Sequence, residues 1–290
     1  MILLSGDRSM VNGDLVIPTG AKSTYQEIAR NGSLSLGNIT FERSNLVVFD
    51  KPETLGIVSE IGVPTPETYY DIDEIPGYPV FYKQDFETGG GARGILWNKA
   101  GCERIPQDAG LIYQEFIDSS PTYCVAFLAR RGSMIASFIH KELLSHPHVG
   151  GSGVVVTTVD DPRLIEYSER ILRRLNFSGW GLIEFKHCPK RDDYVFMEVN
   201  AKFWASIELA FMNNAAFLKE LFGIEYTGPK WPDAIFMDRL AEYGVREYIR
   251  TSMKYRSFYR FHTLRSIPRL PLRFLRRSRD ALREIGAEDL

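Results

Sequence analysis

The chain has 290 residues and a mass of 33.1 kDa, with 44% hydrophobic, 25% charged and 12% aromatic residues. This composition is that of a globular protein of one or two domains, and it excludes a wholly disordered chain. The formal net charge of −2 is close to neutral, which by itself argues against a partner attracted by charge.

Cysteines and apolar segments bear on the location of the protein. Cys102, Cys124 and Cys188 have neither the spacing of metal ligands nor the even number of a disulfide set. The apolar run at the N-terminus is too short for a signal peptide, and no stretch reaches the ~18 apolar residues of a membrane span. We therefore expect a cytoplasmic protein.

Three segments have the pattern of helices. Residues 50–62 and 161–177 each begin with an aspartate that can cap the first turn, and the second has a proline directly after its cap. Residues 202–223 are apolar almost all round, which predicts one buried helix that ends at Gly223.

Other segments are rich in β-branched and aromatic residues and predict strands, one of them with a turn near Arg131. These segments are residues 78–85, 94–98, 111–117, 123–139, 179–186 and 193–200. Runs of strands with intervening helices indicate a mixed α/β or α+β protein.

Basic residues are concentrated at the C-terminal end. Residues 246–283 contain twelve basic and two acidic residues, so this segment carries +10 and the rest of the chain −12. Pro268 and Pro271 argue against one continuous amphipathic helix. One interpretation is attachment to an anionic membrane surface, peripherally at its inner face, and another is docking on the acidic body of the same chain. No recognition motif supports nucleic acid as a partner.

A glycine-rich loop, TGGGARG at residues 88–94, separates two predicted strands. Gly89, Gly91 and Gly94 satisfy G-x-G-x-x-G, but a Rossmann site requires a helix after the loop, and here a strand is predicted. The catalytic and metal-binding motifs of protein kinases are absent from the sequence. The loop is either a flap whose amides close over phosphates, with Lys83 on the preceding strand, or a flexible hairpin tip with a solvated lysine.

Two glutamates and an asparagine are predicted to share one face of a hairpin. If the last two predicted strands pair about Arg191, Glu184 lies opposite Glu198, and Asn200 projects from the same face. Facing carboxylates repel each other, and a divalent cation that prefers oxygen ligands, Mg²⁺ or Mn²⁺, would offset the repulsion. With a flap over phosphates, this indicates a nucleoside triphosphate site; the alternative is the solvent-facing side of a half-buried sheet.

In their order and spacing, these motifs resemble those of the ATP-grasp superfamily, specifically its carbamoyl-phosphate-synthase-like carboligase branch. The resemblance covers about residues 50–223. Its motifs are DK from residue 50, GVPTPE from 62, YPVFYK from 78, the glycine loop, YQEFI from 113, GGSG from 150, GWGLIEF from 179 and EVNAKFW from 198.

The resemblance implies an α+β protein of ATP-grasp fold, in which two α/β subdomains grip ATP between them. It implies four parts: a remnant of a preceding domain at 1–50, a small subdomain with the flap at 51–113, a C-terminal subdomain with the metal site at 114–228, and a basic helical extension at 229–290. The first part, with a strand and helix in residues 14–31, is about half of the usual preceding domain, so that domain is reduced or the chain is an incomplete version of a longer one.

The resemblance also implies roles for single residues, which together make up the predicted site. Phosphate contacts come from Lys51 and Lys83, the flap from Gly89, Gly90, Gly91 and Gly94, the adenine contacts from Gln114, Glu115 and Ile117, the Mg²⁺ ligands from Glu184, Glu198 and Asn200, and the catalytic cations from Lys141 and Lys202. Two positions depart from the family pattern: residues 119–123 lack the acid that often holds the ribose, and Lys202 stands where arginine is commoner.

The implied function is that of an Mg-ATP-dependent ligase for a small-molecule carboxylate and an amine or other nucleophile. The carboxylate attacks the γ-phosphate of ATP, and the nucleophile displaces phosphate from the acylphosphate, which forms a C–N bond and leaves ADP and phosphate. Lysines and the cation neutralise charge, and the flap excludes water. His140 is a weaker candidate than Lys141 for proton transfer. A non-catalytic ATP-binding sensor or scaffold and an ATP-grasp kinase are the alternatives.

Overall fold

The computed structural model of the protein describes residues 2–5, 15–86, 91–105, 110–117, 121–147 and 150–261. Side chains are described from Ile17 onward, apart from that of Arg104. Two predicted flap residues, Gly89 and Gly90, and the basic segment beyond residue 261 lie outside the described residues.

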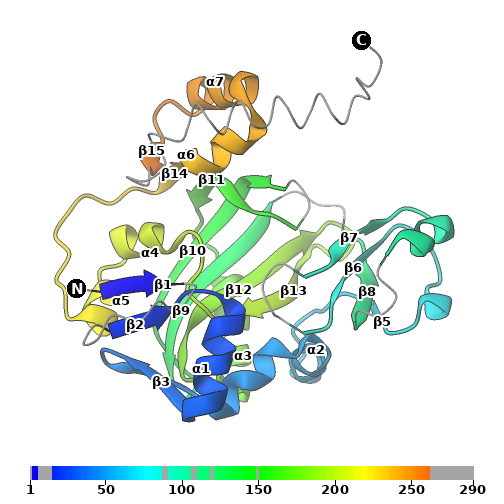
Figure 1. Ribbon diagram of the computed structural model, residues 1–290, viewed down its shortest axis with the longest axis horizontal. Coiled ribbons are helices and arrows are strands. Elements are labelled where there is room, and N and C mark those ends of the chain that lie inside the picture. The colour runs from blue at the N-terminus through cyan, green and yellow to red at the C-terminus, as the bar shows by residue number, and fades with distance from the viewer. Residues whose placement is uncertain are drawn as a thin grey trace.

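A seven-stranded sheet forms the centre of the described structure (Figure 1). Neighbouring strands are antiparallel apart from the last pair, which is parallel. In spatial order the strands are β13 (Asp193–Asn200), β12 (Gly179–Cys188), β9 (Thr122–Arg130), β10 (Ser133–His146), β11 (Ser152–Thr158), β14 (Asp233–Phe236) and β15 (Tyr259–Phe261).

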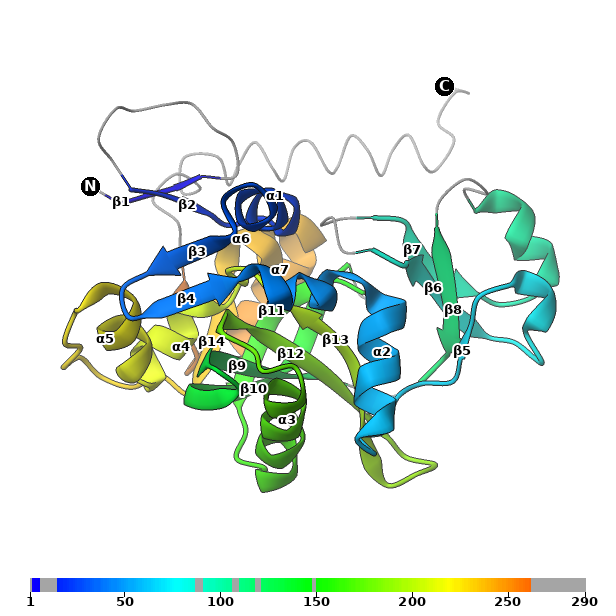
Figure 2. The same ribbon diagram turned by 90° about the horizontal axis from the view of Figure 1, so that it is seen from below.

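A separate four-stranded antiparallel sheet lies to one side of the large sheet (Figure 1). Its order is β5 (Thr68–Tyr69), β8 (Leu111–Glu115), β6 (Val80–Gln84) and β7 (Arg93–Leu96), and it has a small core of its own around Val80, Leu96 and Tyr113. Helix α2 (Lys51–Glu60) lies between the two sheets (Figure 2). The helix contacts β13, and the N–H of Lys51 donates to the carbonyl of Asp85 at the end of β6 (2.8 Å).

Both helices predicted from an aspartate cap are present. Asp50 accepts the N–H of Glu53 at 2.9 Å at the start of α2, and Asp161 accepts the N–H of Arg163 at 2.9 Å at the start of α3 (Pro162–Arg174). Helix α3 packs on one face of the large sheet through its contacts with β9 and β10.

The N-terminal strand and helix are also present, as β2 (Leu15–Pro18) and α1 (Ala21–Asn31). Strand β2 pairs in parallel with β1 (Ile2–Ser5). A hairpin of β3 (Ser33–Leu36) and β4 (Ile39–Glu42) then leads through a 3₁₀ segment, Arg43–Phe49, into α2.

The prediction of one helix over residues 202–223 is wrong. The segment forms two shorter helices, α4 (Ile207–Asn213) and α5 (Ala216–Phe222), after a loop. Asn214 separates them, because its side-chain oxygen accepts the N–H of Ala216 at 3.1 Å and its amide donates to the carbonyl of Ser137 at 2.9 Å. The end at Gly223 is confirmed, since this residue caps α5 with φ +67°.

The C-terminal segment differs from the expected helical extension within its described residues. It contains the strands β14 and β15, of which β15 is at the edge of the large sheet, in addition to α6 (Met237–Leu240) and α7 (Val245–Lys254). Strand β14 is apolar and buried, and it pairs with β11, so part of this segment completes the large sheet. In the ranges that the structure describes, none of the helices has the length and apolar character needed to cross a membrane.

Candidate active site

The predicted hairpin is formed by β12 and β13, with Glu184 paired to Glu198 and Leu182 to Asn200 as expected. Beyond Glu198 the register shifts by one residue, because Met197 is an extra residue on β13. The main-chain oxygen of Met197 accepts the ammonium of Lys83 at 3.0 Å. The bulge therefore presents a carbonyl to the lysine that arrives from the small sheet.

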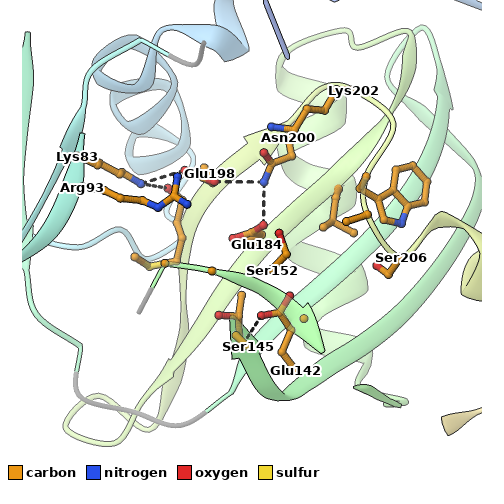
Figure 3. Close-up of a pocket in the computed structure, with 18 of the residues that line it drawn as sticks. Lys83, Arg93, Glu142, Ser145, Ser152, Glu184, Glu198, Asn200, Lys202 and Ser206 are labelled. Atoms are coloured by element: carbon orange, nitrogen blue, oxygen red, sulfur yellow. Dashed lines mark hydrogen bonds and ion pairs between the residues drawn. The ribbon is translucent and has the colours of Figure 1, made fainter. Parts of the chain in front are cut away.

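Lys83, Glu198, Asn200 and Glu184 form one connected polar cluster (Figure 3). The Nζ of Lys83 lies 3.3 Å from an oxygen of Glu198. The amide nitrogen of Asn200 donates to Glu184 at 2.8 Å and to Glu198 at 3.2 Å. Because Lys83 belongs to β6 and the other three belong to β12 and β13, the cluster joins the two sheets.

Burial and repulsion dominate the electrostatics of the carboxylate pair. Burial, followed by the negative charges of Glu198 and Glu142, raises the pKa of Glu184 to about 8, and the nearby Lys202 and Lys83 only partly oppose this. A carboxylate in this position is disfavoured unless more positive charge is supplied.

The donor set of this cluster suits a hard divalent cation. Within the described part of the chain no three carboxylate, imidazole or thiol groups come together as a metal site, and the set here is two carboxylates and one amide. The amide nitrogen of Asn200 faces both carboxylates, and a half-turn of the amide would turn its oxygen toward a cation instead. Oxygen ligands and excess negative charge are what Mg²⁺ and Mn²⁺ prefer.

A cavity of about 1040 Å³ lies at this cluster and is lined by residues from both sheets. Of the predicted site residues, the lining includes Lys51, Lys83, Gly91, Glu115, Ile117, Glu184, Glu198, Asn200 and Lys202. The described part of the flap lies close to the turn before β11, because a Cβ at Gly150 (φ +64°) would lie 3.1 Å from the side chain of Arg93 on β7.

Three of the predicted site residues that the structure describes, Gly94, Gln114 and Lys141, do not line the cavity. Lys141 pairs with Tyr123, whose ring packs on Tyr194 at 4.9 Å, so Lys141 lies on the α3 face of the large sheet and not on the cavity face. Strand alternation gives the cavity position to the next residue, Glu142. The side chain of Gln114 is fully buried and donates to Thr68 at 3.2 Å within the small sheet.

His140 is buried beside the cavity and not in its lining. Its Nε2 lies 3.1 Å from the hydroxyl of Ser206, and burial, assisted by the charge of Arg239, lowers its pKa to about 4. The imidazole is therefore neutral at pH 7, which favours a structural role over proton transfer.

Several charged residues of the cavity were not expected from the sequence. They are Arg93, Glu142, Lys186, Glu208 and Arg239. Glu142 and Lys186 could have been found by strand alternation, because Glu142 is two residues after His140 and Lys186 two residues after Glu184. No sequence pattern pointed to Arg239, because it reaches the cavity from α6, which lies outside the segment that contains the family motifs.

No family model and no curated protein sequence matches the chain. Solved structures do match its fold. Biotin carboxylase from Campylobacter jejuni, in a β,γ-ATP complex, is 15% identical over 73% of this chain, with a TM-score of 0.55. VanG D-Ala:D-Ser ligase from Enterococcus faecalis is 17% identical over 76% of this chain, with a TM-score of 0.54. Pyruvate carboxylase from Rhizobium etli is 14% identical over 69%, with a TM-score of 0.56.

The matched part is 55% of the biotin carboxylase chain, 78% of the ligase chain and 20% of the pyruvate carboxylase chain. At these identities the likeness concerns the fold. The chain has the ATP-grasp fold that the motifs predicted, with its mostly antiparallel large sheet and its smaller second sheet.

Proposed function

We propose that the protein is an Mg-ATP-dependent ligase that joins a carboxylate to an amine through an acylphosphate and releases ADP and phosphate. The observation that carries this proposal is the meeting of Lys83 with Glu184, Glu198 and Asn200 in a large cavity between two sheets. The fold supports it, because a biotin carboxylase in an ATP-analogue complex and a D-Ala:D-Ser ligase share it.

Each charged residue has a task in this proposal. Glu184, Glu198 and Asn200 would hold Mg²⁺, which supplies positive charge where negative charge develops on the phosphates. Lys51 and Lys83 bind the phosphates, and Lys202 stabilises the phosphorylated acyl group. The main chain of Glu115 and Ile117 binds the adenine. The flap from Gly91 to Gly94 limits the access of water to the acylphosphate.

The substitution Glu198→Ala tests this proposal. We expect loss of Mg-ATP-dependent ADP release with an unchanged circular dichroism spectrum, because the carboxylate that faces Glu184 is removed. Turnover at the wild-type rate would show that the metal assignment is wrong. A wild-type protein that binds Mg-ATP but releases no ADP with any acid and amine pair would favour the alternative, a non-catalytic ATP sensor or scaffold.

One surface feature supports contact with an anionic membrane as an additional property. Along α7, Val245, Ile249 and Met253 are 51%, 53% and 70% exposed and follow one another at helical spacing. Arg246 and Arg250 lie beside this apolar stripe on the helical wheel. Basic and apolar groups in this arrangement suit the surface of a bilayer with anionic lipids.

A further inference from the structure

The cavity extends beyond the phosphate-binding cluster to an apolar wall that the proposed ATP chemistry does not use. The wall consists of Ile207 and Phe211 on α4, Phe222 on α5 and Leu144 on β10. The rings of Phe211 and Phe222 meet edge to face, with centroids 5.9 Å apart. All four side chains are only partly buried although they line a cavity, so a ligand with an apolar group would cover surface that is now open.

A second feature of the same region is its pair of carboxylates. Glu142 on β10 and Glu208 in the first turn of α4 line the cavity, and Arg239 is the cation that acts on both. Figure 3 shows Glu142 projecting into the same space as Glu184 and Ser152. Burial raises the pKa of Glu142 to about 6, and partial removal from water also raises that of Glu208, although its side chain keeps contact with solvent.

Arg239 already makes contacts within the protein. Its guanidinium donates to the main-chain oxygens of Gly153 and Ala205 and lies 4.2 Å from the ring centre of Phe236. The charge of Lys186 also lowers the pKa of Glu142, but less than that of Arg239 does. At Glu208, Arg239 is the cation whose charge lowers the pKa. Arg239 thus serves both carboxylates, with Lys186 as a weaker second cation at Glu142, and the region favours a ligand that brings a positive charge.

We propose that the nucleophile of the ligase is a primary amine with an apolar side group. Its ammonium lies at Glu142 and Glu208, and its apolar group lies against Ile207, Phe211 and Phe222. This inference rests on the proposed ligase function and narrows its substrate class.

The reaction at this site is balanced. The ammonium gives one proton to the carboxylate of Glu142, and the free amine attacks the carbonyl carbon of the acylphosphate. The C–N bond forms, and the bond between the acyl carbon and the bridging oxygen of the phosphate breaks. The leaving phosphate takes the second proton of the nitrogen. The products are the amide and inorganic phosphate, and Glu142 returns its proton to solvent.

Calorimetric titration of the full chain with n-butylamine, n-hexylamine and 1,5-diaminopentane, without nucleotide, tests this inference apart from catalysis. Each buried methylene strengthens binding about fourfold, so n-hexylamine should bind roughly fifteenfold more tightly than n-butylamine. Its affinity should also exceed that of 1,5-diaminopentane, because the second ammonium of the diamine would face the apolar wall. Equal affinity for all three amines, or no binding of n-hexylamine at millimolar concentration, would overturn the inference.

Variants then separate the two halves of the subsite. Phe222→Ala should remove most of the preference for n-hexylamine over n-butylamine, whereas Ile224→Ala, at an exposed apolar residue two positions on, should keep it. Glu208→Gln should weaken the binding of n-hexylamine at least fivefold. It should leave the binding of 1-hexanol unchanged, because the alcohol carries no charge. Parallel losses for the amine and the alcohol would contradict the role of Glu208.

Turnover distinguishes this inference from the proposed ligase function. If n-hexylamine binds as expected but no acid leads to ADP release, the ligase proposal fails and the amine site remains. If ADP release responds to ammonia and not to apolar amines, the ligase proposal stands and this inference fails.

Discussion

Replacing Glu184 by glutamine should stabilise the protein in the absence of metal and nucleotide. The pKa of Glu184 is raised to about 8, so the carboxyl group ionises more readily in the unfolded chain than in the folded one. The folded state therefore loses stability as the pH rises from about 4.5 to about 8, and the loss is complete above that range. Glutamine carries no charge, and its oxygen can still accept the hydrogen bond from Asn200.

The magnitude follows from the size of this shift. A pKa difference between about 4.5 and about 8 corresponds to roughly 4–5 kcal/mol, because one pKa unit is about 1.4 kcal/mol. The side chain is partly exposed to the cavity, and solvent there lowers the value. We expect Glu184→Gln to raise the free energy of unfolding by about 2 kcal/mol at pH 8.5 and by less than about 1 kcal/mol at pH 5.5.

Urea unfolding followed by tryptophan fluorescence, at both pH values and without Mg²⁺, measures this difference. Glu74→Gln at an exposed glutamate is the matched control and should change stability by less than about 0.5 kcal/mol at either pH. The same Glu184→Gln protein should lose Mg-ATP-dependent ADP release. A variant that is less stable than wild type at pH 8.5, or a gain of equal size at both pH values, would refute the electrostatic reasoning.

Three further variants test other parts of the molecule. Lys83→Met removes the cation that contacts Glu198, and we expect at least a tenfold loss of kcat/KM for ATP in a steady-state ADP-release assay. Gly181→Ala would place a Cβ 2.8 Å from the main-chain oxygen of Asn200, so unfolding in urea should show a loss of about 1–3 kcal/mol. Ile249→Glu with Met253→Glu should reduce sedimentation with phosphatidylglycerol liposomes, and unchanged sedimentation would dispose of the membrane contact.

The strongest sequence predictions were those that rest on local rules. Strand alternation fixes which side chains share a face, so the pairing of Glu184 with Glu198 followed from the lengths of two strands and the polar turn between them. Aspartate caps at Asp50 and Asp161 are likewise local, because the side chain and the amide that it accepts are two or three residues apart.

The features that the sequence did not predict concern contacts between distant segments. Lys141 was placed in the site by the family resemblance, but the pairing of β9 with β10 decides its face, and that face is occupied by α3. The break at Asn214 depends on a hydrogen bond to Ser137 on another element. Arg239 reaches the cavity only because β14 adds to the large sheet and turns α6 toward it. None of these contacts leaves a periodic signal in the sequence.

The extra residue in β13 has a consequence for tolerance to deletion. In a regular strand, removing one residue would turn every later side chain to the opposite face. Because Met197 has no paired residue on β12, its removal would leave Phe196 opposite Phe185 and Glu198 opposite Glu184, each on its present face. The hairpin can therefore be one residue shorter without inverting its polar side, and the change would withdraw the carbonyl that Lys83 contacts together with the Met197 side chain, which lines the cavity. A deletion of this kind would remove the lysine's hydrogen bond to the main chain and keep its attraction to Glu198, whereas Glu198→Ala removes the attraction and keeps the hydrogen bond.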